Sequence, residues 1–119
     1  MGAVYVNVNL SWPEANGEYE NDFLVDTGAT DSMAPAKDLL ALGFKPAGKM
    51  IYELANGEAV EYDYCYSIIK FMGDGTAGRI IMGPDNIEPI LGVTALESMG
   101  IVVDPKNGQL KRLPMVALK

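Results

Sequence analysis

The sequence predicts a single all-β domain with two short helices, and three observations favour this fold class. Apolar and polar residues alternate with a period of two along several segments, as expected for half-buried strands. Turn sequences such as Asn-Gly separate these segments, and only two short stretches have helical features. With 119 residues, of which 49% are hydrophobic and 21% charged, the chain fits one packed domain over residues 1–119.

The N-terminal part predicts a β-hairpin that ends on an aspartate. Residues 4–10 alternate valine or leucine with tyrosine or asparagine and predict the first strand. After a turn that contains Asn16-Gly17, a second strand over residues 19–25 leads directly into Asp26. Asn-Gly favours such a hairpin because both residues tolerate the positive φ angles of a tight turn.

A short helix and a second hairpin follow. Residues 35–42 predict the helix, with proline in its first turn and Gly43 placed as its C-terminal cap. Residues 50–60 have Asn56-Gly57 at their centre, and two extended arms around such a turn predict a protruding hairpin.

One long strand and a glycine-rich segment come next. Residues 60–72 alternate tyrosine and isoleucine with polar residues and predict a single strand. Residues 73–78 read Gly-Asp-Gly-Thr-Ala-Gly, which matches the spacing of a dinucleotide-binding fingerprint. A strand over residues 79–82 follows instead of the helix that phosphate binding requires, so we interpret the segment as a hairpin turn.

The C-terminal part predicts a second helix and a last hairpin. Thr94 and Glu97 have the spacing of a capping box, which predicts a helix over residues 95–99. Residues 101–103 and 109–113 predict the hairpin. Three apolar residues predict a final strand: Met115, Val116 and Leu118. This strand either pairs with a second subunit or lies on the plain surface.

Composition excludes several function classes. The formal net charge of −7 argues against nucleic-acid binding, which depends on clustered lysine and arginine. The sequence contains no histidine, which excludes histidine-based metal sites and Ser/His or Cys/His nucleophilic pairs. We expect no metal and no other cofactor, and acid-base chemistry must come from carboxylates, tyrosines, lysines or the single thiol of Cys65.

The sequence also carries an expectation about the compartment. The first residues alternate instead of forming a basic and then an apolar block, and no apolar run is long enough for a membrane span. A single cysteine cannot form an internal disulfide. We therefore expect a cytoplasmic protein without a membrane partner.

Asp26-Thr27-Gly28-Ala29 is the motif with the clearest chemical meaning. It places a carboxylate at the end of the apolar residues 23–25, where burying an aspartate requires a reason. The simple alternative is an aspartate that caps a turn, because Asp is common before such sequences. The motif alone is a weak signal, and the segments that follow it decide the interpretation.

Those segments occur in a characteristic order. The Asn56-Gly57 hairpin comes after the motif, residues 78–84 form a strand and loop, and Ile-Leu-Gly at residues 90–92 precedes the second helix. In this order and spacing the chain resembles the retropepsin-like aspartic proteases, which include viral and bacterial members. The resemblance extends over nearly the whole chain, from about residue 4 to residue 113.

The resemblance implies a closed, barrel-like β domain of the retropepsin-like acid protease fold, with a flap hairpin, that acts as a homodimer. One Asp26 from each subunit would meet at the twofold axis, share a proton and activate a water molecule that attacks the peptide bond. The implied activity is that of an aspartic endopeptidase on a peptide or protein substrate. The alternative is a protease-like module that dimerises and binds peptides without cleaving them.

Roles for neighbouring residues also follow from the resemblance. Thr27 would hydrogen-bond across the twofold axis, Gly28 would let backbone and substrate come close, and Ala29 would complete the support of the site. The candidate substrate-binding residues follow the motif, occupy the flap tip or begin the later loop: Thr30, Asp31, Leu54, Ala55, Asn56, Gly57 and Pro84.

Two features depart from the viral pattern. Many retroviral enzymes have an Asp–Arg pair that supports the dimer, and the corresponding positions here are Thr30 and Val93. The flap contains fewer glycines than viral flaps, and Tyr52 and Glu53 are candidates for stiffening it. The mode of dimer support and the mobility of the flap are therefore left open by the sequence.

Overall fold

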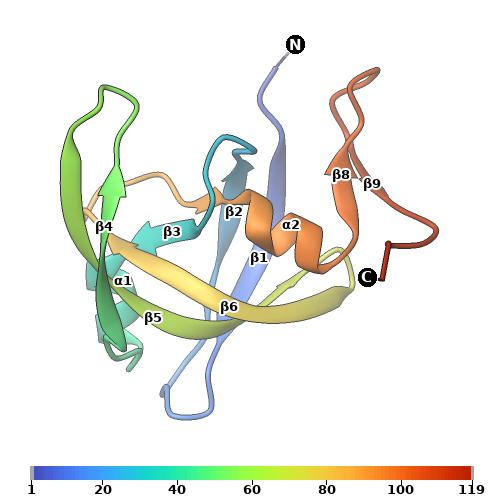
Figure 1. The fold of residues 1–119 in the computed structure, drawn as a ribbon. Coiled ribbons are helices and arrows are strands. Elements are labelled where there is room, and N and C mark those ends of the chain that lie inside the picture. The colour runs from blue at the N-terminus through green and yellow to red at the C-terminus, as the bar shows by residue number, and fades with distance from the viewer. Residues whose placement is uncertain (1, 119) are drawn as a thin grey trace.

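The computed structural model describes residues 2–118, which form a β-structure with two short helices (Figure 1). The elements follow the predicted order closely, with two additional short strands, one before the first helix and one before the second. Their bounds are β1 Tyr5–Ser11, β2 Tyr19–Val25, β3 Ser32–Pro35, α1 Ala36–Ala41, β4 Gly48–Glu53, β5 Ala59–Phe71, β6 Asp74–Gly83, β7 Ile90–Leu91, α2 Val93–Ser98, β8 Ile101–Val103 and β9 Leu110–Arg112.

The main sheet closes on itself. Its strand order is β1-β2-β7-β3-β6-β5-β4, and an additional pairing of β1 with β5 joins the two ends of the barrel. β4 pairs only with β5 and extends the sheet beyond the closed part, so the β4–β5 hairpin protrudes from the barrel (Figure 1). The predicted barrel-like fold with a projecting hairpin is confirmed.

β7 occupies a special place in this sheet, because it lies between β2 and β3. Leu24 and Val25 of β2 pair with it in parallel, and Met33 of β3 pairs with it on the other side. The chain from β2 to β3 must therefore pass over the end of β7. This crossing segment contains residues 26–31, in which the sequence analysis placed the candidate site.

The core fills the barrel and extends under both helices. Its largest fully buried hydrophobic side chains come from strands, helices and one loop: Phe23, Phe44, Leu10, Leu39, Ile80, Leu91, Leu96, Ile101 and Val8. Each buried side chain of this size contributes about 1.5–3 kcal/mol through removal from water. The barrel is therefore a rigid support for the segments at its rim.

β5 changes its buried face along its length. In the barrel part, Cys65, Ser67, Ile69 and Phe71 point inward, whereas Tyr66 is 44% exposed. Tyr66 points outward, opposite to these side chains, and its ring packs on those of Trp12 and Tyr64.

Gly43 ends α1 as predicted. Its φ of +89° is in the left-handed region, and its N–H donates to the carbonyl of Leu40 while the N–H of Phe44 donates to that of Leu39. A Cβ at Gly43 would lie 2.9 Å from the backbone nitrogen of Asn16. Glycine is required here both for the turn and for the close approach of the first hairpin.

Three local features differ from the sequence analysis. The turn after β5 occupies only Met72 and Gly73, both with positive φ, and the other glycines of residues 73–78 belong to β6. The strand β3 had no sequence signal that we used, because it has only four residues. Met115, Val116 and Leu118, which predicted a final strand, have no regular secondary structure in the single chain, and their pairing with a second subunit stays a prediction.

Candidate active site

Asp26 lies at the end of β2 with its side chain half-buried. Its N–H donates to the carbonyl of Leu91 in β7 at 3.0 Å, and its own carbonyl accepts from the N–H of Ala29 at 3.1 Å. The N–H of Gly28 donates to the Asp26 carboxylate oxygen Oδ1 at 3.0 Å. Backbone groups thus fix both the position and the orientation of the carboxylate.

Gly28 and Thr27 form the outer surface of this turn, and both are exposed. A Cβ at Gly28 would come within 3.3 Å of the Asp26 Oδ1 atom, which is tighter than an ordinary contact. The absence of a side chain therefore keeps the carboxylate accessible, as the sequence analysis expected of this glycine.

The second half of the loop is held by α2. The N–H of Val93 donates to the carbonyl of Ala29 at 2.8 Å, and the N–H of Thr94 donates to that of Thr30 at 3.1 Å. The helix begins at Val93 and has no side-chain cap, so the predicted capping box of Thr94 and Glu97 is wrong. The loop carbonyls satisfy the first helical N–H groups and make a side-chain cap unnecessary.

Gly92 and Ser32 lock the loop against β7. The buried Ser32 hydroxyl accepts a hydrogen bond from the Gly92 N–H at 2.9 Å. A Cβ at Gly92 would lie 2.6 Å from the carbonyl carbon of Asp31, a distance that real structures do not tolerate. The Ile-Leu-Gly segment of the sequence therefore ends in glycine because the loop backbone passes directly over it.

A cavity of about 400 Å³ opens beside the loop, under the β4–β5 hairpin. One wall comes from the loop and the other from the hairpin, and β6 and β7 form the base. Most of its side chains are apolar, with Asp31 and Glu53 as its carboxylates. Its lining residues are Gly28, Ala29, Thr30, Asp31, Met33, Ile51, Tyr52, Glu53, Leu54, Tyr62, Ile81 and Ile90.

The predicted substrate-binding residues divide into two groups. Thr30, Asp31 and Leu54 line the cavity, together with Gly28 and Ala29 from the motif. The others lie outside its lining and are exposed: Ala55, Asn56 and Gly57 at the tip of the β4–β5 hairpin, and Pro84 in the loop after β6.

Tyr52 connects the two walls of the cavity. Its hydroxyl donates to the Asp31 carboxylate oxygen Oδ2 at 2.8 Å. Burial raises the pKa of Tyr52 to about 12, and the hydrogen bond to Asp31 acts in the same direction. The phenol is therefore protonated, and able to donate, throughout the range in which proteins normally work.

Sequence reasoning missed part of this cavity. Met33, Ile81 and Ile90 reach it from three different strands, and only the pairing of β3 with both β6 and β7 brings them together. Tyr52 was considered for stiffness alone, and its contact with Asp31 had no sequence signal. The alternation within β4 would have placed Ile51 and Tyr52 on opposite faces, without showing which face meets the loop.

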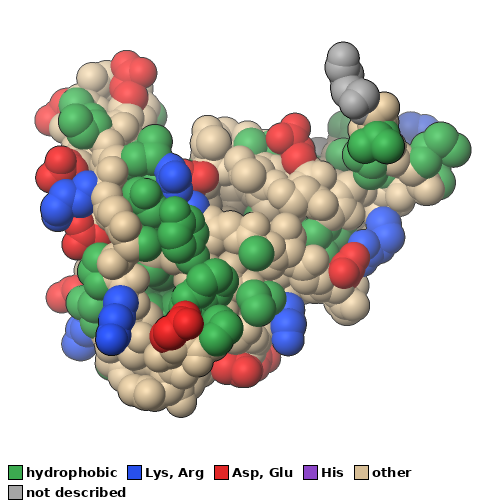
Figure 2. Space-filling model, turned by 60° about the horizontal axis from the view of Figure 1, so that its bottom comes forward, with side chains coloured by type: hydrophobic (Ala, Val, Ile, Leu, Met, Phe, Trp, Pro, Cys, Tyr) green, Lys and Arg blue, Asp and Glu red, His purple; other side chains and the backbone are tan. Residues whose placement is uncertain are grey.

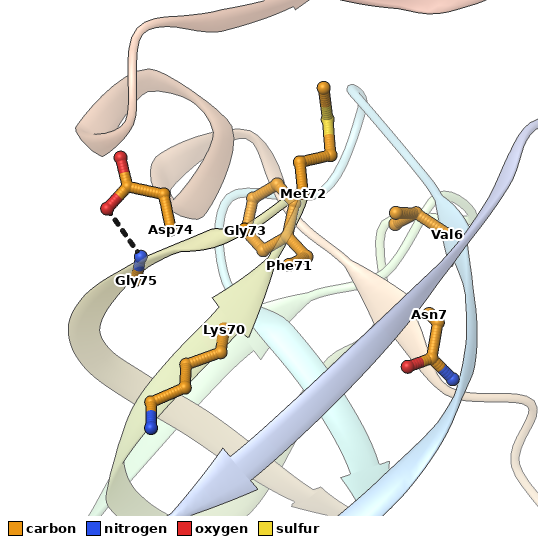
Figure 3. A pocket seen from close by; sticks show the side chains of 8 residues that line it. All are labelled: Val6, Asn7, Lys70, Phe71, Met72, Gly73, Asp74 and Gly75. Atoms are coloured by element: carbon orange, nitrogen blue, oxygen red, sulfur yellow. Dashed lines mark hydrogen bonds between the residues drawn. The ribbon is translucent and has the colours of Figure 1, made fainter.

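A second hollow lies elsewhere on the molecule. It has a volume of about 620 Å³ and lies between β1 and the turn from β5 to β6, where Val6, Asn7, Phe71 and Met72 surround it (Figure 3). None of its lining residues belongs to the candidate site. Its carboxylate, Asp74, accepts from the Gly75 N–H and pairs with Arg112, and the side chain of Lys70 at its rim is exposed.

Further groups of interest have structural explanations. Cys65 is a buried free thiol, and burial raises its pKa to about 11, which keeps it protonated and unreactive. Across residues 2–118, no three carboxylate, cysteine or histidine side chains come close enough together to hold a metal ion. In the same part of the chain, neither helix has the length and apolar character needed to span a membrane.

Surface charge is dispersed on the face seen in Figure 2. Lysine and arginine side chains lie scattered among aspartate and glutamate, and hydrophobic side chains gather on the side of the β4–β5 hairpin. Ile51 is 68% exposed and Leu54 is 42% exposed, both in or next to β4. The hairpin thus presents apolar surface beside the cavity.

A closed barrel, an aspartate presented at the end of a buried strand and an apolar cavity beside it define a class of proteins, the retropepsin-like aspartic proteases. Residues 12–95 match the family model described as aspartyl protease, and the chain belongs to this family.

Solved structures agree with this fold. The structure of the Simian Foamy Virus (mac) protease is similar with a TM-score of 0.55 and 16% sequence identity, over 78% of this chain and 91% of that chain. It is one of 127 solved chains with significant similarity. At this identity the likeness shows the fold alone. Among curated proteins, none matches the sequence.

Proposed function

We propose that the protein is an aspartic endopeptidase whose active site forms when two copies of the chain meet. The observation that carries this proposal is the Asp26 carboxylate, which backbone hydrogen bonds hold at an accessible turn next to an apolar cavity. Within residues 2–118, only Oδ1 has a hydrogen-bond partner, and that partner is the Gly28 N–H.

A second carboxylate must come from another copy of the chain. In the loop from residue 26 to residue 31 the remaining carboxylate, Asp31, is engaged by Tyr52 on the hairpin side. Thr27 and Gly28 are exposed beside Asp26, so the surface that would face a partner is open in the single chain. A symmetric dimer about an axis next to Thr27 would bring two Asp26 side chains together.

The chemistry of such a pair follows from electrostatics. Two carboxyl groups in contact cannot both ionise, so the pair holds one proton between them. The ionised Asp26 removes a proton from a water molecule, which attacks the carbonyl carbon of the peptide bond. The protonated Asp26 donates to the carbonyl oxygen, and proton transfer to the nitrogen then releases the amine. The residues of this chain complete the cycle without a covalent intermediate.

The cavity favours extended peptides with apolar side chains near the cleaved bond. Its walls are formed mainly by Met33, Ile51, Leu54, Ile81 and Ile90. The β4–β5 hairpin would serve as the flap, which covers the bound peptide and excludes water from the reacting bond.

Two measurements test the proposal together. The first is cleavage of a mixed peptide library, read by mass spectrometry, with Asp26→Asn as the control. The second is the molecular mass of the particle in solution by sedimentation equilibrium. We expect cleavage by the wild-type dimer and none by the variant. Peptide binding without cleavage would favour a silent binding module, and a strictly monomeric active protein would exclude the shared dyad.

A further inference from the structure

The hydrogen bond between Tyr52 and Asp31 joins two segments that are otherwise separate. Tyr52 belongs to β4, the strand at the free edge of the sheet, and Asp31 belongs to the loop that follows Asp26. Within residues 2–118, no other side-chain hydrogen bond connects residues 48–58 with residues 26–32. The bond crosses the cavity and therefore sets how far apart its two walls lie.

The hairpin has few connections to the rest of the protein besides its own pairing. Within residues 2–118, β4 pairs only with β5, the Arg79 guanidinium of β6 donates to the Met50 sulfur, and residues 53–59 are all exposed. The tip is closed by its own backbone bonds, from the N–H of Leu54 to the carbonyl of Glu58 and from that of Gly57 to the carbonyl of Leu54. These bonds fix the shape of the tip and not its height above the loop.

The surroundings of Tyr52 favour this one partner. Its ring lies 6.4 Å from that of Tyr62 in a tilted arrangement, which limits the directions in which the hydroxyl can point. The Met50 sulfur is the other acceptor within reach, at 3.8 Å, and a thioether accepts weakly. The hydrogen bond to the Asp31 carboxylate is shorter, at 2.8 Å, and a carboxylate is the stronger acceptor.

We propose that Tyr52 is a positioning residue of the peptidase: through Asp31, it holds the hairpin over the cavity at the height at which a peptide binds. This inference rests on the proposed function. The bond touches neither Asp26 nor its turn, so its loss should weaken the binding of substrate and leave the chemical step intact. Asp31 keeps its Oδ1 atom available to the peptide, since Tyr52 occupies only Oδ2.

The first test is kinetic and uses Tyr52→Phe, which removes the hydroxyl and keeps the ring. We expect KM for a cleaved peptide to rise about five- to tenfold, the range for one hydrogen bond to a charged group at a partly exposed site, while kcat changes less than about twofold. The matched control is Tyr66→Phe. Tyr66 lies in β5 outside the cavity, and its hydroxyl has no hydrogen-bond partner within residues 2–118.

A double-mutant cycle identifies the partner. Asp31→Ala removes the acceptor, and in this background Tyr52→Phe should have no further effect on KM. Asp31→Asn keeps an acceptor oxygen and should retain part of the wild-type affinity. Additive effects of Tyr52→Phe and Asp31→Ala would overturn the inference, because they would show that the two side chains act separately.

Amide hydrogen exchange tests the same bond without any use of activity. We expect exchange at the hairpin tip, residues 54–58, to accelerate severalfold in Tyr52→Phe and to stay unchanged in Tyr66→Phe, with unchanged exchange in the barrel strands of both. Equal exchange in wild type and Tyr52→Phe, or a fall in kcat alone, would overturn the inference. If the wild type cleaves no peptide, the proposed function fails, and the exchange measurement still decides whether Tyr52 holds the hairpin.

Discussion

The two walls of the cavity are built in opposite ways. The loop of residues 26–31 is fastened by backbone hydrogen bonds to Leu91, Val93 and Thr94, and it packs on Gly92 without space for one more carbon atom. Among the described residues 2–118, the tip of the β4–β5 hairpin bonds only to itself, and a single phenol links the hairpin to the loop. The difference separates two tasks in the proposed peptidase: one wall would hold a carboxylate in place, and the other would open for a peptide.

We expect the largest effect on activity from a substitution in the loop of residues 26–31. We expect Asp26→Asn to reduce kcat/KM by at least about 10³-fold, since an amide can neither accept the proton from water nor share one with its partner. Stability should change little, because the asparagine Oδ1 atom can still accept from the Gly28 N–H. Peptide cleavage and thermal unfolding of the same preparations test this. A variant that still cleaves would remove Asp26 from the mechanism.

Two glycines, one packed against the loop and one at the tip of the hairpin, test the difference directly. We expect Gly92→Ala to lower the free energy of unfolding by about 1–3 kcal/mol through overpacking, because its Cβ would lie 2.6 Å from the Asp31 carbonyl carbon. Gly57→Ala meets no atom within 4 Å, and its φ of +87° carries the only penalty. We expect about 1 kcal/mol for that change, expressed mainly in the hairpin.

Urea unfolding measures both glycine variants, and hydrogen exchange at the hairpin tip separates a local effect from a global one. The contrast between the walls would be refuted by a larger global loss in Gly57→Ala than in Gly92→Ala.

The long strand β5 runs from the hairpin into the barrel, and the buried Cys65 lies in its barrel part. Burial raises the pKa of this thiol from 9.0 to about 11, so folding favours the neutral form. Its contribution to stability is complete below pH 9.0 and is lost as the pH rises toward about 11. We expect the free energy of unfolding to fall across this interval, and Cys65→Ala to flatten the decline at a loss of about 1 kcal/mol near neutral pH.

Urea titrations at several alkaline pH values measure this slope. Tyr52, whose pKa is raised from 10.0 to about 12, should leave a residual decline at higher pH in the Cys65→Ala variant. An identical slope in wild type and variant would show that Cys65 is not the titrating group.

The smallest effect should arise on the outer face of the hairpin. Lys49 and Asp63 form an ion pair with a distance of 2.6 Å, and their side chains are 64% and 38% exposed. We expect Lys49→Gln to change the free energy of unfolding by less than about 0.5 kcal/mol, because water screens such pairs. Hydrogen exchange at the tip should also stay as in the wild type. Faster exchange would mean that the hairpin is held from outside as well as through Tyr52.

Local patterns predicted most of the strands because the alternation of side chains and the turn residues lie within short windows. Residues 19–25 form β2 with the predicted bounds, and Gly43 ends α1 as expected. Two of the differences involve distant partners. β3 exists because its four residues pair with β6 in parallel and with β7, far along the chain. α2 begins at Val93 instead of Ala95 because its first N–H groups donate to the carbonyls of Ala29 and Thr30.

For the candidate site, the motif identified the turn at Asp26 and the hairpin opposite it, but not the cavity between them. Periodicity shows which side chains share a face of one strand and does not show which faces of β4, β6 and β7 meet. The Tyr52–Asp31 contact depends on the height of the hairpin above the loop, a distance between two segments that no short window of sequence contains.

The insertion of β7 between β2 and β3 has a consequence for biosynthesis. Asp26 is translated early, yet the groups that fix its turn and loop, from Leu91 to Thr94, are added much later. A growing chain on the ribosome therefore carries the aspartate in an unformed turn until the segment from Leu91 to Thr94 has emerged and docked. The turn and the loop after it take their final form only when β7 enters the sheet between β2 and β3.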